Sequence, residues 1–233
     1  MPASVQMPAS RMPEIETLGE DALLLRFGDT IDASCNARVH ALAQQIGLAR
    51  PPWLRDIVPA YASLALFVDV GGLSQAPDPL AEAASWLQQQ SFNDDGDSDS
   101  GRVVEIHVHY GGGDGPDLDA LAAHAGMTAR EVVERHVASE YTVAMLGFAP
   151  GFPYLLGLNQ ALAMPRLQTP RTRVGAGSVG IGGAQTGIYP RSGPGGWRII
   201  GRTSQVLFDP ARNPPSLLAA GDRVRFVAID ALP

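Results

Sequence analysis

The chain has 233 residues, a formal net charge of -7, 45% hydrophobic residues and one cysteine, Cys35. This length and apolar content can fill the core of one large domain or of two smaller ones. The acidic balance argues against nucleic-acid binding, which needs a basic face. A single cysteine excludes an internal disulfide and a thiolate metal cluster within one chain. All basic residues are arginine, which excludes a Schiff-base lysine and a P-loop lysine.

Residues 1–13 are rich in Pro, Ser and Met and lack the continuous apolar segment of a signal peptide. We expect them to be a flexible leader. No stretch of the sequence approaches the roughly 20 apolar residues that span a bilayer. We therefore expect a cytoplasmic protein that does not associate with membranes.

Residues 14–110 alternate between strand and helix patterns, which predicts a small α/β domain. The acidic, polar run at residues 93–101 is expected to be a loop. The order of the elements is βαββαβ, the ferredoxin-like arrangement. Strands are predicted at residues 22–26, 56–59, 63–70 and 103–108, and helices at residues 34–46 and 79–90.

Residues 111–233 change character, with two short helices followed by short β-prone runs between Gly, Pro and Asn. The helices are predicted at residues 117–125 and 129–139, and Thr128 with Glu131 forms a capping box for the second. Short, evenly spaced strands of this kind are typical of a closed barrel. The runs lie at residues 141–146, 177–181, 186–189, 197–202, 204–208 and 223–229. The sequence therefore predicts an α+β protein of two domains that meet near Tyr110.

Residues 141–208 contain no Asp or Glu. A guanidinium group binds carboxylates and phosphates in a bidentate manner, so the counterpart could be an anionic substrate, a nucleotide or an acidic partner. Ordinary solvated arginines, paired with acids from the first domain, are the alternative. Because this stretch also lacks a group suited to proton transfer, we infer that another polypeptide donates the missing acid or base. The arginines of residues 141–208 are Arg166, Arg171, Arg173, Arg191, Arg198 and Arg202.

The segment GFAPGFPYLLG, residues 147–157, alternates Gly, Pro and aromatic residues. Prolines fix φ and glycines allow positive φ, so we expect a rigid, irregular loop. On a barrel rim such a loop lines a ligand site or simply packs.

Several motifs resemble one family in order and spacing: GFAPGFPYL, PRLQTPRTRV, GSVGIGGAQTGIYP, PGGWRIIGRT, LFDP and LLAAGDRVRF. They are similar to the family of the 5-oxoprolinase B subunit, also called KipI or allophanate hydrolase subunit 1. The resemblance implies a cyclophilin-like barrel related to a carboxyltransferase subdomain. It also implies a complex with a homologous barrel, the C subunit of 5-oxoprolinase, and with the A subunit. Together these proteins use ATP, with magnesium, to open 5-oxo-L-proline to L-glutamate.

The resemblance also implies a substrate site on the loop and the barrel, with His136 as a candidate catalytic residue. A packing or orienting role is the alternative for His136. The substrate-binding candidates are Phe148, Pro150, Gly151, Phe152, Tyr154, Arg166, Arg171, Gln185, Tyr189, Trp197 and Arg202.

Other patterns in the sequence have more than one interpretation. Glu105, His107 and His109 share one strand face, but a solvated face is favoured there and no metal site is expected. The run YGGGDGPDL offers either backbone donors for an anion or a turn between domains. Two other functions fit the family names: an inhibitor of a sensor histidine kinase, or a urea or allophanate-type carboxyltransferase component that works with biotin.

Overall fold

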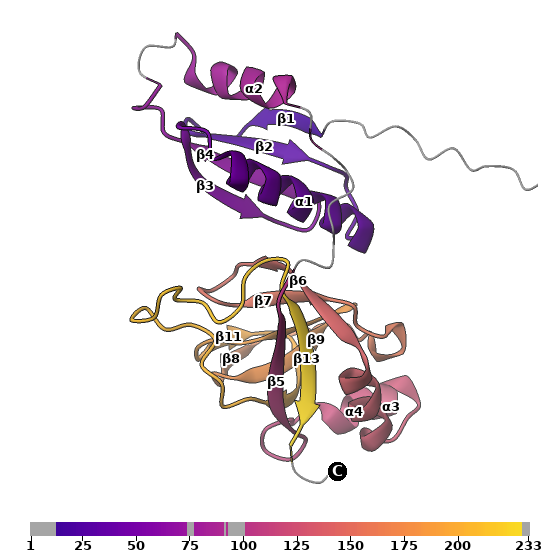
Figure 1. Ribbon diagram of the computed structural model, residues 1–233. Coiled ribbons are helices and arrows are strands. Elements are labelled where there is room, and N and C mark those ends of the chain that lie inside the picture. Colours follow the sequence, from indigo (N-terminus) through magenta and orange to yellow (C-terminus); the bar gives the residue numbers. More distant parts are fainter. Residues whose placement is uncertain (1–12, 74–76, 91, 93–100, 230–233) are drawn as a thin grey trace, which may run out of the picture. The chain divides into compact units, whose positions relative to one another are not determined.

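The computed structural model describes residues 13–73, 77–90, 92 and 101–229, and the chain divides into two units, residues 1–98 and 99–233 (Figure 1). The predicted leader, apart from Pro13, and nearly all of the predicted acidic loop lie outside the described residues. Among the described residues, no helix combines the length and the apolar character needed to cross a bilayer.

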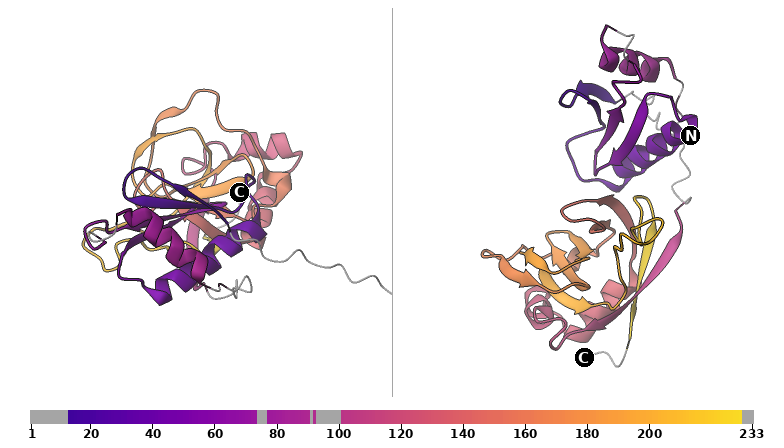
Figure 2. Two further views of the ribbon diagram at one scale, coloured as in Figure 1. Left: turned by 90° about the horizontal axis from the view of Figure 1, so that it is seen from above. Right: turned by 90° about the vertical axis from the view of Figure 1, so that its left-hand side faces the viewer.

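The N-terminal unit is a four-stranded antiparallel sheet in the order β1-β2-β4-β3. Its helices α1 and α2 pack into one core cluster, so they cover the same face of the sheet (Figure 2). Asp32 and Asp78 accept a hydrogen bond from the backbone N–H three residues on, which starts each helix. The elements are β1 (Glu14–Thr17), β2 (Ala22–Arg26), α1 (Ala33–Ala49), β3 (Leu54–Pro59), β4 (Ser63–Val68) and α2 (Pro79–Gln89).

The α+β class, a small α/β unit followed by a barrel, is confirmed, but one strand belongs to a different sheet from the one predicted. Strand β5 (Val103–Tyr110) does not close the first unit. It lies in the barrel, parallel to β13 (Arg223–Ala228), and buries Ile106 and Val108 in the barrel core. The edge position beside β2 is taken by β1, so the first unit reads ββαββα. The domain boundary predicted near Tyr110 is therefore wrong, and the two units divide near residue 98.

The second unit is a closed barrel in the strand order β10-β7-β6-β13-β5-β12-β9, with a two-stranded sheet, β8 and β11, beside it. Helices α3 and α4 gather at one end of the barrel, where Leu121 and Val132 enter its core (Figures 1 and 2). The remaining elements are α3 (Leu118–Ala125), α4 (Ala129–Ala138), β6 (Glu140–Leu146), β7 (Pro153–Leu156), η1 (Gln160–Leu162), β8 (Arg171–Val174), β9 (Ser178–Gly182), β10 (Gln185–Ile188), β11 (Gly193–Gly195) and β12 (Arg198–Arg202).

Three barrel-unit predictions need correction. The predicted strand at residues 204–208 is absent, and only Phe208 forms an isolated bridge, with Ser216. The segment 147–157 is not an irregular loop throughout, because Pro153–Leu156 is the barrel strand β7. A proline at the first residue of a strand removes no essential ladder bond. Strands β8 and β11 were not predicted, because their Arg, Thr, Gly and Pro residues carry little strand signal.

Candidate functional site

The β9–β10 hairpin presents different side chains on its two faces. Val179, Ile181 and Ile188 point into the barrel core. The intervening positions on the outside are glycines, Gly180 and Gly182, and the side chain of Trp197 lies over them. A Cβ on Gly182 would lie 2.6 Å from the indole ring, closer than any real contact allows. The hairpin therefore needs glycine here so that a large aromatic ring can cover its outer surface.

Aromatic rings collect around this indole and form what we call the outer aromatic face: Phe148, Phe152, Tyr154, Tyr189 and Trp197. Three of them, Phe152, Tyr189 and Trp197, are buried and form a core cluster outside the barrel interior, whereas Phe148 is exposed and Tyr154 is half-buried. Phe152 lies at the centre, with its ring centroid 5.5 Å from that of Trp197, 5.2 Å from Tyr189 and 4.9 Å from Tyr154. The contacts are edge-to-face or tilted, which are favourable aromatic geometries. Five predicted site residues from three segments are thus brought together.

The loop before β7 holds Phe148 on the rim of this face. The residue is 65% exposed although its ring contacts Phe152, and its φ of 62° is unusual for a residue with a side chain. The neighbouring Gly151 has φ 79°, and a Cβ there would lie 2.7 Å from Cβ of Phe208. Pro150 is exposed between them. An exposed aromatic ring held in a strained backbone conformation is a feature of ligand sites.

Positive charge lies over the outer aromatic face. The guanidinium carbon of Arg166 lies 5.5 Å from the centroid of the Trp197 ring, a cation–π arrangement. Burial raises the pKa of the Tyr189 phenol, and the nearby guanidinium groups of Arg166 and Arg171 act in the opposite direction. The phenol therefore stays protonated at neutral pH and can donate a hydrogen bond. An anion placed here would meet the exposed guanidinium of Arg166 and the partly exposed guanidinium of Arg171, while the ring of Tyr189 is buried beneath them.

Arg171 is fixed by a carboxylate that the sequence motifs did not assign to the site. Asp117, 7% exposed, accepts bidentate hydrogen bonds of 2.9 and 2.7 Å from Arg171, and one of 2.6 Å from the backbone N–H of Ile199. The side chain of Arg171 remains 32% exposed. The signal for Asp117 was its position at the start of a helix within the motif YGGGDGPDL. It orients Arg171 and leaves part of the guanidinium accessible.

The arginines of residues 141–208 do not form one cluster free of carboxylates. Arg202, predicted to bind substrate, donates to the backbone carbonyl of Ala176, and its guanidinium lies 3.9 Å from the carboxylate of Asp114. Its contacts are therefore with the segment between β8 and β9 and with the turn before α3. Arg198 donates to the carbonyl of Pro165. The acids near Arg171 and Arg202 come from the loop before α3 in the same unit, not from the first domain as the alternative supposed.

His136 lies inside the barrel with none of its surface exposed. Nε2 is 3.2 Å from the hydroxyl of Thr186, and that hydroxyl donates to the carbonyl of Gly180, so Nε2 carries the proton. Nδ1 therefore accepts the hydrogen bond of 2.8 Å from the hydroxyl of Tyr110. Burial lowers the pKa of His136 to about 3. The predicted catalytic role is not supported, because the ring is neutral, fully paired and out of reach of a substrate.

Gln185, at the start of β10, lies directly opposite Gly182 in the hairpin. It is 8% exposed. Residues directly opposite each other in an antiparallel pair project to the same face, so its side chain emerges beside the indole that covers Gly182. The side-chain amide of Gln185 therefore lies beside the outer aromatic face.

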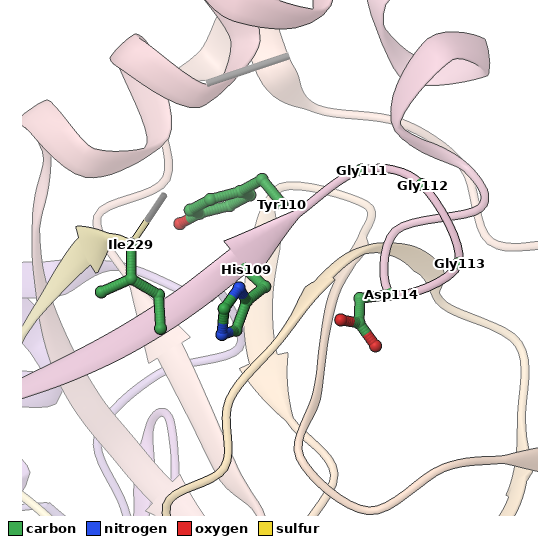
Figure 3. A pocket seen from close by; sticks show the side chains of 7 residues that line it. All are labelled: His109, Tyr110, Gly111, Gly112, Gly113, Asp114 and Ile229. Atoms are coloured by element: carbon green, nitrogen blue, oxygen red, sulfur yellow. The ribbon is translucent and has the colours of Figure 1, made fainter. Parts of the chain in front are cut away.

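A separate pocket of about 310 Å³ lies at the turn between β5 and α3 (Figure 3). The N–H groups of Gly111 and Gly115 donate to the carbonyls of Ile200 and Gly111, and the carboxylate of Asp114 lies at the pocket. These features suit a structural turn better than an anion site. The turn lies within the second unit, not between domains as expected.

The strand face with Glu105, His107 and His109 does not assemble ligands. The backbone N–H of His107 donates to the side chain of Gln205, which donates in turn to the carbonyl of Glu105. Within the described ranges, no group of three or more His, Cys, Asp or Glu side chains is placed to hold a metal ion.

Comparison with known proteins gives consistent matches. The model of the family "Carboxyltransferase domain, subdomain C and D" matches residues 13–218. The 5-oxoprolinase B subunit of Bacillus subtilis (strain 168) is 43% identical over 232 residues, covering 93% of this chain and 92% of its own length. The 5-oxoprolinase B subunit of Escherichia coli O157:H7 is 43% identical over 211 residues, covering 90% of this chain and 93% of its own.

Solved structures share the fold. A crystal structure of TTHA0988 is 40% identical with a TM-score of 0.74, and the match covers 90% of this chain but 40% of that one. The urea amidolyase of K. lactis has a TM-score of 0.69 at 18% identity, covering 96% of this chain and 15% of its own. At that identity the likeness concerns the fold alone.

Proposed function

We propose, because the chain belongs to the family of the 5-oxoprolinase B subunit and to the carboxyltransferase-domain family, that it is the B subunit of an ATP-dependent 5-oxoprolinase. The complex would contain a homologous barrel, the C subunit, together with an A subunit, and would cleave 5-oxo-L-proline to L-glutamate. This chain would supply one side of the substrate site.

The outer aromatic face is the observation that carries the proposal. A five-membered lactam with a carboxylate needs an apolar surface for its ring, a cation for its carboxylate and polar donors for its carbonyl. The exposed ring of Phe148 and the half-buried ring of Tyr154 offer the surface, supported from below by the buried rings of Phe152 and Trp197. Arg166 and the exposed part of Arg171 offer the charge. Small anionic substrates are commonly held in this way, by an apolar lining with a few charged groups.

The chemistry of this face supports binding more than proton transfer. Burial raises the pKa of Tyr189, so its phenol is a donor at neutral pH and not a base. His136 is sealed in the core. A hydrolysis needs an acid or base within hydrogen-bond reach of the reacting atoms. We therefore place that group on a partner protein that closes over the outer aromatic face.

ATP would act through the complex and not through a phosphate site of this chain. The turn at residues 111–115 does not fit a phosphate, because two of its amides are used internally and Asp114 adds negative charge. Phosphorylation of the lactam oxygen elsewhere in the site would make the ring carbon electrophilic. Arg166 and Arg171 would hold the carboxylate end while that oxygen gains negative charge.

Reconstitution tests the proposal. The chain is purified alone and together with candidate A and C subunits, and ATP hydrolysis is measured with and without 5-oxo-L-proline. We expect substrate-dependent hydrolysis and L-glutamate release from the complex and none from the chain alone. Full activity of the isolated chain would refute the shared site.

Carboxyl transfer is the second candidate, favoured by the family description "Carboxyltransferase domain". The same preparations, supplied with urea, bicarbonate, ATP, a biotin carboxylase and a biotinylated carrier, would then transfer the carboxyl group from carboxybiotin to urea. That activity in place of 5-oxo-L-proline turnover would select this candidate.

A further inference from the structure

The amide of Gln185 is buried and lacks a partner. Its residue is 8% exposed, and Nε2 has no hydrogen-bond partner among the described residues. Leaving a buried N–H donor unpaired is destabilising, so such groups are normally satisfied in folded proteins. Because Nε2 is itself buried in the free chain, an acceptor carried by a ligand pairs with it only when the side chain of Gln185 turns outward.

The surroundings of this amide define the acceptor. Gln185 faces outward opposite Gly182, over which the Trp197 ring lies, and Arg166 lies over that same ring. A ligand on the outer aromatic face would thus meet a neutral donor beside the indole and a positive charge above it. The neutral donor suits a carbonyl oxygen, and the guanidinium suits a carboxylate. The ligand that fits carries both groups on one small ring.

We propose that Gln185 is a specificity-determining residue that donates a hydrogen bond from Nε2 to the lactam carbonyl oxygen of the substrate. The identification of that oxygen rests on the proposed function. The hydrogen bond lets the site distinguish 5-oxo-L-proline from L-proline, which has the same ring size and carboxylate but no lactam oxygen. A site built to pair with a substrate group discriminates against the analogue that lacks it, because its own polar atom is then left unpaired.

Binding to the assembled complex without ATP tests this assignment. The dissociation constants of 5-oxo-L-proline and L-proline are measured calorimetrically for the native complex and for Gln185→Met, in which an apolar chain of similar size replaces the amide. We expect the variant to bind 5-oxo-L-proline about tenfold more weakly or worse and L-proline with unchanged affinity. Gln160→Met, at an exposed position of η1, is the matched control and should alter neither constant.

A second readout uses the full chain alone. Removing a buried donor that has no partner should leave the urea midpoint of Gln185→Met unchanged or higher. A clear fall in that midpoint would show that the amide has a structural partner and would overturn the proposal.

The outcomes separate the two hypotheses. Lactam binding that depends on Gln185, without turnover, would reject the proposed function and keep the assignment. Turnover with equal affinity in the native complex and the variant would reject the assignment and keep the function. A parallel loss of L-proline binding would show general damage to the face and overturn the assignment, as would the absence of lactam binding by the native complex.

Discussion

Strand β10 carries two consecutive polar side chains, Gln185 and Thr186, which differ in whether their hydrogen bonds are satisfied. Thr186 points inward, where it receives a hydrogen bond from His136 and donates one to the carbonyl of Gly180. Gln185 points outward and is almost as well buried, yet its Nε2 has no partner among the described residues. Burial alone therefore does not distinguish a structural polar group from a binding one. Under the proposal made above, the difference lies in whether the hydrogen bonds are satisfied within the chain, because an unpaired buried donor is stabilised by an acceptor from outside it.

The largest expected effect is a loss of stability in acid, caused by His136 on the inward side of β10. The pKa of His136 is about 3 in the folded chain against about 6.5 when unfolded, so the unfolded chain binds the proton first as pH falls. The neutral, buried imidazole therefore contributes fully to stability above pH ~6.5. As the pH falls from there to ~3, the free energy of unfolding decreases by about 4 kcal/mol. Urea unfolding of the full chain between these pH values measures it. A variant without the imidazole should lose this part of the pH slope, and an equal slope in both would contradict the assignment.

Removal of the inner histidine comes next. His136→Leu leaves the hydroxyl of Tyr110 without its acceptor, so we expect the free energy of unfolding to fall by about 2–4 kcal/mol. Adding Tyr110→Phe should restore part of the loss, because both polar partners are then absent. The KM of the assembled complex for 5-oxo-L-proline should stay near the native value. A large rise in KM with little loss of stability would place His136 in the substrate site after all.

A methyl group at Gly182 probes the outer face directly. The added Cβ of Gly182→Ala would meet the Trp197 ring at 2.6 Å, so the indole must move, at a cost of about 1–3 kcal/mol. Substrate affinity should fall as well, since Arg166 and Gln185 are placed relative to that ring. Gly193→Ala is the matched control, because a Cβ there meets no atom within 4 Å. Equal effects of the two changes would show that the indole does not depend on this approach.

Arg166→Met should have the smallest effect on stability and a clear effect on binding. The side chain is exposed, and its contact is a cation–π interaction worth about 0.5–1 kcal/mol at such a site. We expect a change in unfolding midpoint near the limit of detection, with the KM for 5-oxo-L-proline raised about tenfold. Arg130→Gln, on the exposed surface of α4, is the control. An unchanged KM would remove Arg166 from the site.

The sequence by itself determined the helices, most of the strands and the family, although it did not predict β1, β7, β8 and β11. Apolar spacing and caps such as the Thr128–Glu131 box predicted all four α-helices that the structure describes, because these signals act over a few residues. The motifs around GFAPGFPYL and GGAQTGIYP predicted the family and the aromatic residues of the outer face. These features depend on short-range order, which the chain carries in its spacing.

The tertiary structure alone decided which sheet each strand joins and which polar groups are paired. The residues of β5 form a strand in either unit, and only pairing with β13, more than 100 residues away, places it in the barrel. The same holds for His136, which becomes a core residue through its hydrogen bonds with Tyr110 and Thr186. It holds also for Asp117, which orients Arg171, 54 residues further along the chain. Periodicity specifies that a side chain has a buried face but not its partner, because hydrogen bonds between distant segments exist only once the barrel has closed.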